Sequence, residues 1–167
     1  MKKFLAAMLS FVILLTFAFF AVASGDSDDE EKTQEPGSAV VNSDADNAKI
    51  GDYKVEIKEV RLAKDYEGKD TVIVKYSFTN NSDEAAAFDW TFDHKVYQNG
   101  VSLEPAYVLD DSANYDESSS MKEIKKGVTL EVEEAYILND TVTDIDVEVS
   151  ELISFDDTTV SRTFSIK

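Results

Sequence analysis

Several residue types that carry chemistry are scarce in this chain of 167 residues. It contains no cysteine, so disulfides, a thiolate nucleophile and a cysteine-ligated zinc site are excluded. The single histidine, His94, is too few to build an ordinary zinc site without cysteine. A Ser-His-Asp triad would need the same histidine, and no Gly-x-Ser-x-Gly motif presents a serine. We therefore predict a protein that is not an enzyme, with no catalytic or cofactor-binding residues and with His94 on the surface or at a strand edge.

Positive charge is scarce as well. The chain has 16 Lys and Arg against 34 Asp and Glu, a formal net charge of -18. Without Lys2 and Lys3, which belong to an N-terminal leader, the charge becomes -18 - 2 = -20. A field of this sign repels phosphate backbones and anionic lipid, which argues against nucleic-acid binding and peripheral membrane binding. Cations remain as candidate partners, although a solvated acidic surface is the favoured interpretation.

The N-terminus has the pattern of a secretory signal peptide over residues 1–23. Two lysines precede an apolar run that ends in the small residues before Ser24, which predicts cleavage between Ala23 and Ser24. Because the run is about 20 residues long, an uncleaved N-terminal membrane anchor is the alternative. Both interpretations place the rest of the chain outside the cytoplasm, as a secreted or cell-surface protein. Membrane contact is then expected only through a retained leader.

The region around Ser24 is lipoprotein-like, but serine stands where a lipobox has its lipid-accepting cysteine, so we expect no lipidation. Residues 24–49 follow with eight acidic residues and two lysines, and their only apolar pair is Val40-Val41. Such a segment cannot bury enough apolar surface to offset its chain entropy. We predict a disordered acidic tether over residues 24–49 that holds a domain of residues 50–167 away from a surface.

Alternating apolar and polar residues predict strands throughout this domain. The clearest run places Val72, Val74, Tyr76 and Phe78 on one face. A second run, residues 86–92, is expected to be another strand with Phe88, Trp90 and Phe92 on a common face. Asn99-Gly100 is a strong hairpin signal, because a type I′ turn needs positive φ at both positions. Seven or eight short strands without a convincing amphipathic helix predict an all-β, antiparallel β-sandwich.

Irregularities in the pattern give further expectations. The apolar phase slips between Ile57 and Val60, which predicts a β-bulge or a strand that changes sheets. A similar phase change is expected near Ala135. Residues 105–120 read as a long exposed loop, whose Tyr107 and Tyr115 are expected to pack at the core or its edge.

Several runs match the pattern of one protein family: residues 66–69, 72–82, 96–101 and 135–138, and the turn before Gly127. On these motifs the chain resembles an uncharacterised family of secreted proteins and lipoproteins of Gram-positive bacteria. The resemblance covers residues 50–167 and implies an immunoglobulin-like sandwich, as in a mycobacterial secreted antigen family. It supplies no catalytic or ligand residues. Two departures are Ser24 in place of the lipobox cysteine and Lys126 where a proline often precedes the turn glycine.

The function predicted from these observations is binding or adhesion at the bacterial cell envelope, with an envelope protein or a glycan as partner. A secreted hydrolase or hydrolase inhibitor is one alternative. The other is a calcium-stabilised structural module, because hard cations take oxygen ligands. Its candidate ligands share one acidic loop: Asp110, Asp111 and Asp116. They lack the spacing of an EF-hand, so a solvated loop without a cofactor is favoured.

Overall fold

The computed structural model of the chain describes residues 40–41, 48–109, 113–153 and 158–167. The leader, the expected cleavage site at Ala23 and Ser24, and most of the acidic tether lie outside these ranges. Two short strands, at residues 40–41 and 48–50, fall wholly or partly within the expected tether. Within the described ranges, no helix has the length and apolar character needed to cross a membrane.

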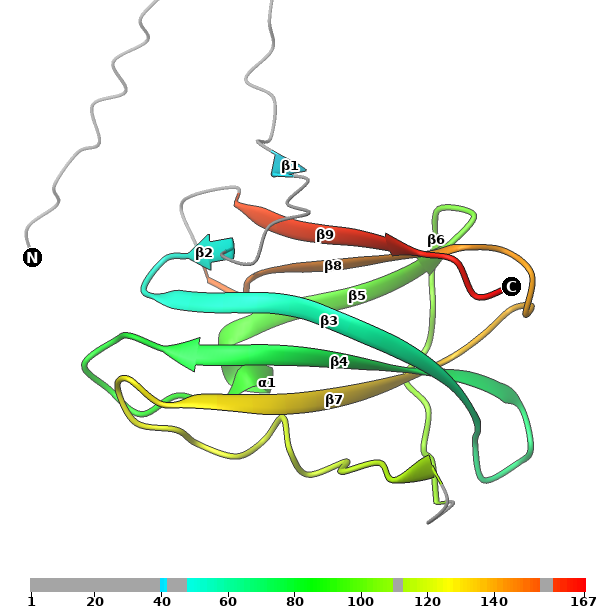
Figure 1. Ribbon diagram of the computed structural model, residues 1–167, viewed down its shortest axis with the longest axis horizontal. Coiled ribbons are helices and arrows are strands. Elements are labelled where there is room, and N and C mark those ends of the chain that lie inside the picture. The colour runs from blue at the N-terminus through cyan, green and yellow to red at the C-terminus, as the bar shows by residue number, and fades with distance from the viewer. Residues whose placement is uncertain (1–39, 42–47, 110–112, 154–157) are drawn as a thin grey trace, which may run out of the picture. The chain divides into compact units, whose positions relative to one another are not determined.

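The described residues form two sheets that face each other (Figure 1). In one sheet the strands lie in the order β2 (Ala48–Ile50), β3 (Tyr53–Lys64), β4 (Asp70–Asn80) and β7 (Thr129–Ile137). In the other the order is β1 (Val40–Val41), β9 (Thr159–Phe164), β8 (Ile145–Glu151), β5 (Phe92–Gln98) and β6 (Val101–Ser102). All pairs are antiparallel except β1 with β9. The predicted all-β, immunoglobulin-like sandwich is confirmed.

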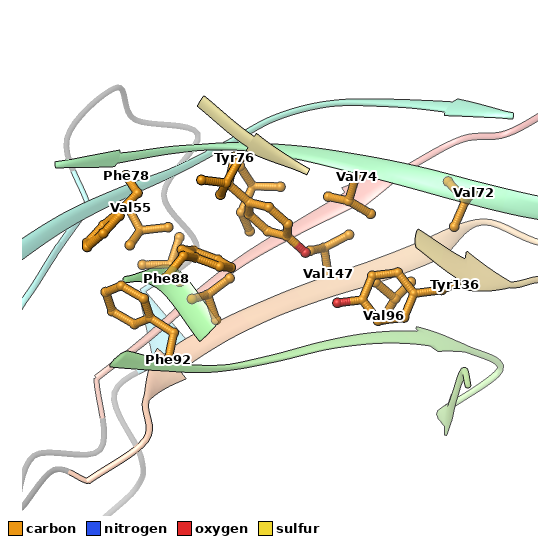
Figure 2. Close-up of a cluster of buried hydrophobic side chains, with 14 of the residues drawn as sticks. Val55, Val72, Val74, Tyr76, Phe78, Phe88, Phe92, Val96, Tyr136 and Val147 are labelled. Carbon is orange, nitrogen blue, oxygen red and sulfur yellow. The ribbon is translucent and has the colours of Figure 1, made fainter. Parts of the chain in front are cut away.

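The core lies between the two sheets and is dominated by β4. Its predicted inward residues, Val72, Val74, Tyr76 and Phe78, all have an exposed fraction of 0%. Figure 2 shows these side chains above those of the facing sheet. Full burial of one such side chain contributes about 1.5–3 kcal/mol, so this strand supplies much of the hydrophobic contribution to folding.

The predicted bulge in β3 is confirmed, because its register against β4 shifts between Ile57 and Glu59. The phase change expected near Ala135 is wrong. Strand β7 pairs with β4 without interruption from Thr129 to Ile137. Both faces of β7 are covered, so apolar residues occur on both and imitate a phase change. Because the register is uninterrupted, Glu134 lies on the core side of β7, two residues after Val132.

The expected strand over residues 86–92 is also wrong. Residues Phe88–Thr91 form the short helix α1, and Phe92 begins β5. Phe88 and Phe92 are buried, but Trp90 is 76% exposed. Positions four apart share a face in a helix as they do in a strand. The spacing of the two phenylalanines therefore fits either structure, and Trp90 is the residue that distinguishes them.

The predicted hairpin at Asn99-Gly100 is confirmed, with φ angles of 51° and 75°. Just before it, the side chain of Gln98 is buried, at 1% exposed. Its amide nitrogen donates to the carbonyls of Asp140 and Thr143, and its amide oxygen accepts from the backbone N–H of Asn139 at 2.8 Å. This one side chain ties the hairpin to the loop that follows β7.

The segment that follows the hairpin, here called the covering segment, lies on the outer face of the β4 and β7 sheet with its described residues 104–109 and 113–119. It was expected to be an exposed loop, yet Ala106 and Val108 are buried against Ile73 and Ala135. The backbone N–H of Ala106 donates to the carbonyl of Ala135 at 2.8 Å, which fixes the segment along β7. Tyr115 packs at the edge of this second cluster as predicted. For Tyr107 the expectation is wrong, because it is 62% exposed.

Candidate functional site

A polar cluster interrupts the apolar interior between the sheets. Asp89 comes from α1, His94 from β5 and Glu134 from β7. One ligand atom from each side chain lies within 4.8 Å of the other two. All three residues are partly buried. The expected surface position of His94 is thus corrected, since only 19% of its side chain is exposed and it shares the core face of β5 with Phe92 and Val96.

The imidazole of His94 is held in one orientation. Its Nδ1 lies 2.7 Å from the hydroxyl oxygen of Tyr136, and its ring stacks on that of Phe88 with centroids 5.2 Å apart. Its Nε2 lies 3.4 Å from Oδ1 of Asp89. These contacts leave Nε2 directed at the carboxyl groups, the arrangement found where a histidine binds a proton or a metal.

The two carboxyl groups have opposite pKa shifts. Burial raises the pKa of Glu134 to about 7, and the neighbouring Asp89 carboxylate adds to this effect. The polar contact with the His94 imidazole is the main cause that lowers the pKa of Asp89. The hydroxyl of Ser120, a residue 1% exposed, contacts both carboxyl groups. The charge of the cluster therefore changes near neutral pH.

Two buried oxygens in this region have no hydrogen-bond partner among the described residues, namely Oδ1 of Asp89 and the hydroxyl of Tyr76. Tyr76 is 0% exposed, and Figure 2 shows its hydroxyl pointing toward that of Tyr136. Burial raises the pKa of both tyrosines, so both hydroxyls stay protonated. Unpartnered polar atoms are uncommon inside proteins and call for an explanation.

A second feature lies on the outer face of the same sheet. It is a groove of about 580 Å³ between β4, β7 and the covering segment. Its lining is mostly polar and consists of Lys75, Val108, Leu109, Asn114, Tyr115, Asp116, Ser119, Glu131 and Glu133. The ammonium of Lys75 lies 3.2 Å from Glu59, 3.8 Å from Glu133 and 3.9 Å from Glu131.

An arginine at the groove fixes the position of the covering segment. Arg61 donates to both carboxylate oxygens of Glu133, at 2.8 and 2.9 Å. The same guanidinium donates to the carbonyls of Ala113 and Asn114. A planar fork with several donors suits this combination of carboxylate and backbone contacts, which a lysine could not make.

Of the three predicted calcium ligands, only Asp116 is described. It lies at the groove, where its carboxylate pairs with Lys122 at 2.6 Å and accepts from the hydroxyl of Ser118 at 2.8 Å. Asp110 and Asp111 lie outside the described residues. Calcium binding by this loop therefore stays a prediction.

Sequence reasoning missed the polar cluster, although one signal was present. Leu130, Val132 and Tyr136 alternate on the core side of β7, and that period places Glu134 among them. A charged residue in phase with a buried face is a signal for a buried site. The helical turn that brings Asp89 to the cluster had no comparable signal.

Comparisons with known proteins agree with this fold. No curated protein matches the chain. Among solved structures, a candidate lipoprotein from Staphylococcus aureus subsp. aureus NCTC 8325 is 20% identical, with a TM-score of 0.51 over 71% of this chain and 91% of that one. A protein from Enterococcus faecalis, solved by NMR, is 17% identical, with a TM-score of 0.56 over 77% of this chain and 95% of that one. At these identities the likeness shows the fold alone. A family model matches residues 26–151, and the chain therefore belongs to the family of domains of unknown function DUF5067.

Proposed function

We propose that the chain is an exported binding module of the bacterial cell envelope, without enzymatic activity, and that its ligand binds in the outer-face groove. The leader pattern supports export, and so does the likeness to a structure described as a candidate lipoprotein. The observation that carries the proposal is the groove itself. Its volume of about 580 Å³ falls within the usual range of ligand sites. Its floor is a rigid sheet, and its wall is a segment fixed by Arg61.

The lining of the groove indicates the chemistry of the ligand. Hydrogen-bonding groups from Asn114, Asp116 and Ser119 dominate, with the ring of Tyr115 and the apolar side chain of Leu109 beside them. Lys75 is already close to three glutamates, so the described lining residues offer no unneutralised positive charge. An anionic polymer would be repelled by it and by the net charge of the chain. A neutral glycan of the envelope fits this combination of hydroxyl-binding groups and one aromatic ring.

The test is retention of the protein on envelope glycan. Purified protein would be passed over immobilised envelope polysaccharide with neutral and anionic fractions kept separate. The double variant Leu109→Ala, Glu131→Ala changes two exposed groove residues and should weaken retention on the neutral fraction at least tenfold. The matched control, Val142→Ala, Glu123→Ala, changes two exposed residues outside the groove lining and should retain normally. Equal retention of both variants, or retention on the anionic fraction alone, would contradict the proposal.

A further inference from the structure

We propose that Asp89, His94 and Glu134 bind one divalent transition-metal cation, with Zn²⁺ as the representative ion. The three side chains come from three different elements, α1, β5 and β7, and offer one imidazole nitrogen and two carboxylate oxygens. These are donor types that bind such ions in proteins. The proposal revises the expectation that one histidine is too few for a zinc site, because two carboxylates supply the remaining protein ligands. The inference is independent of the proposed glycan function, because the groove lies on the other face of the sheet.

Distances between the donor atoms suit a single ion. Bonds from Zn²⁺ to nitrogen and oxygen ligands are about 2.1 Å, so ligand atoms at the corners of a tetrahedron lie about 3.4 Å apart. Nε2 of His94 and Oδ1 of Asp89 are 3.4 Å apart. The atom of Glu134 is within 4.8 Å of both, a separation that a side-chain rotation can shorten. Three protein ligands leave the fourth position of the ion for a water molecule.

The surroundings of His94 resemble the support that metal-binding histidines receive. A ligating histidine normally uses its second ring nitrogen for a hydrogen bond that fixes the ring. Here Nδ1 is 2.7 Å from the Tyr136 hydroxyl, and Phe88 stacks on the ring. Tyr136 is therefore a positioning residue in the proposal, while Nε2 is the ligand atom.

Unpartnered polar atoms point to a ligand at the same place. Oδ1 of Asp89 is buried and accepts no hydrogen bond from the described residues, although it faces Nε2. The fully buried hydroxyl of Tyr76, also without a partner within the described ranges, points toward Tyr136 beside the cluster. A cation bound to Asp89 would supply the missing partner of Oδ1. Its positive charge would also offset the repulsion between the neighbouring carboxyl groups of Asp89 and Glu134.

The choice of ion follows from the same donors. Calcium needs six to eight oxygen ligands and does not favour imidazole, so three donors that include a histidine suit it poorly. Magnesium prefers oxygen ligands and keeps most of its water. Imidazole suits zinc, copper, iron and nickel.

The experiment is a titration of the full chain, in mild detergent, with ZnCl₂. Calorimetry would give the stoichiometry and affinity, and ¹⁵N NMR would follow the imidazole nitrogens. Because His94 is the only histidine, its Nε2 resonance reports on this site alone. We expect one zinc ion to bind more tightly than the weak binding of zinc by the surface carboxylates. The Nε2 resonance should shift at the same equivalence point. CaCl₂ and MgCl₂ should cause neither.

Two matched variants separate this site from the acidic surface. Glu134→Gln and Glu131→Gln remove the same charge from the same strand, but from opposite faces. We expect the first to weaken zinc binding at least tenfold and the second to leave it within twofold. Tyr136→Phe should weaken zinc binding about 10–100-fold, as expected for a group that orients a ligand. Circular dichroism of each variant without zinc verifies that it is folded.

Three outcomes would overturn the proposal. The first is no binding at 1 mM ZnCl₂. The second is binding that leaves the Nε2 resonance of His94 unchanged. The third is binding that folded Glu134→Gln retains at full strength, because the ion would then be held by the acidic surface.

Discussion

Glu133 and Glu134 are neighbours in β7, yet they lie on opposite faces of the sheet and their pKa values shift in opposite directions. Burial acts to raise the pKa of Glu133, but the hydrogen bonds and positive charge of Arg61 outweigh it, and the net pKa is lowered. The pKa of Glu134 rises to about 7, because burial outweighs the favourable contacts with Ser120 and His94. Glu133 is therefore fully ionised near neutral pH, whereas Glu134 is only partly ionised.

The comparison shows that a strong cationic partner can outweigh the effect of burial on the state of a carboxyl group. Glu133 is only 8% exposed and still keeps its charge, whereas burial dominates at Glu134, which has no bidentate arginine beside it. The two hydrogen bonds from Arg61 replace the water that burial removes from Glu133. Asp89 and His94 do not replace it in this way for Glu134. The pair of Arg61 and Glu133 fixes the covering segment. The cluster of Asp89, His94 and Glu134 remains able to exchange a proton or bind a cation.

The largest effect is expected from removing the arginine. Arg61→Met leaves Glu133 enclosed without its partner and frees the carbonyls of Ala113 and Asn114. We expect a loss of about 3 kcal/mol in the free energy of unfolding at pH 7, measured by urea denaturation. The double variant Arg61→Met, Glu133→Leu should recover most of the loss. If the single variant is as stable as the parent, the pair does not hold the outer face together.

A smaller effect, with a defined pH dependence, is expected at Glu134. An unfolded chain releases this proton near its ordinary pKa of 4.5, whereas the folded chain retains it up to about pH 7. A rise in pH therefore stabilises the unfolded state more than the folded state. This group should lower the free energy of unfolding by about 2 kcal/mol between pH 5 and pH 8.

The glutamine variant of this residue isolates its contribution. Glu134→Gln should remove that part of the pH dependence and be more stable than the parent at pH 8. Chemical denaturation at both pH values measures the difference. Parallel pH profiles of parent and variant would show that Glu134 ionises normally.

Tyr136→Phe should have a smaller effect still. It removes the hydroxyl beside Nδ1 of His94 and leaves the aromatic packing in place. A net hydrogen bond contributes about 1 kcal/mol, which is the expected loss in a thermal melt. ¹⁵N NMR should show that His94 has changed its tautomer or acquired a mixture of both. An unaltered histidine spectrum would mean that Tyr136 does not set the ring orientation.

The smallest effect is expected from calcium. Thermal melts with millimolar calcium and with a chelator should coincide, because the carboxylate of Asp116 is already engaged by Lys122 and Ser118. A ligand at a hundredfold excess over its dissociation constant would add about 2.7 kcal/mol. An upward shift of the midpoint by several degrees would restore the acidic loop as a calcium site.

Local patterns in the sequence predicted the parts of the fold that depend on local chemistry. The alternation in β4, the bulge after Ile57 and the turn at Asn99-Gly100 each need only neighbouring residues, and all three were predicted. Helix α1 was not, because the spacing of Phe88 and Phe92 suits a helix and a strand equally. Its identity depends on tertiary packing, which overrides weak local preference.

The polar cluster could not be predicted for a similar reason. Asp89 reaches it only because α1 replaces the expected strand, and Glu134 only because β7 keeps one register throughout. Ser120 comes from a segment that Asp116 and Ser119 connect to Glu133 on the outer face. A site assembled from separate segments has no characteristic residue spacing that could be recognised in the sequence.

The buried amide of Gln98 has a consequence for hydrogen exchange. Asn139 lies in an exposed loop, where backbone amides normally exchange with solvent within seconds, but its N–H donates to the Gln98 side chain inside the sandwich. That amide can exchange only when the end of the sandwich opens and withdraws the acceptor. A loop residue would then report the opening of the core, and Gln98→Ala should convert it into an ordinary fast-exchanging amide while the centre of β4 remains protected.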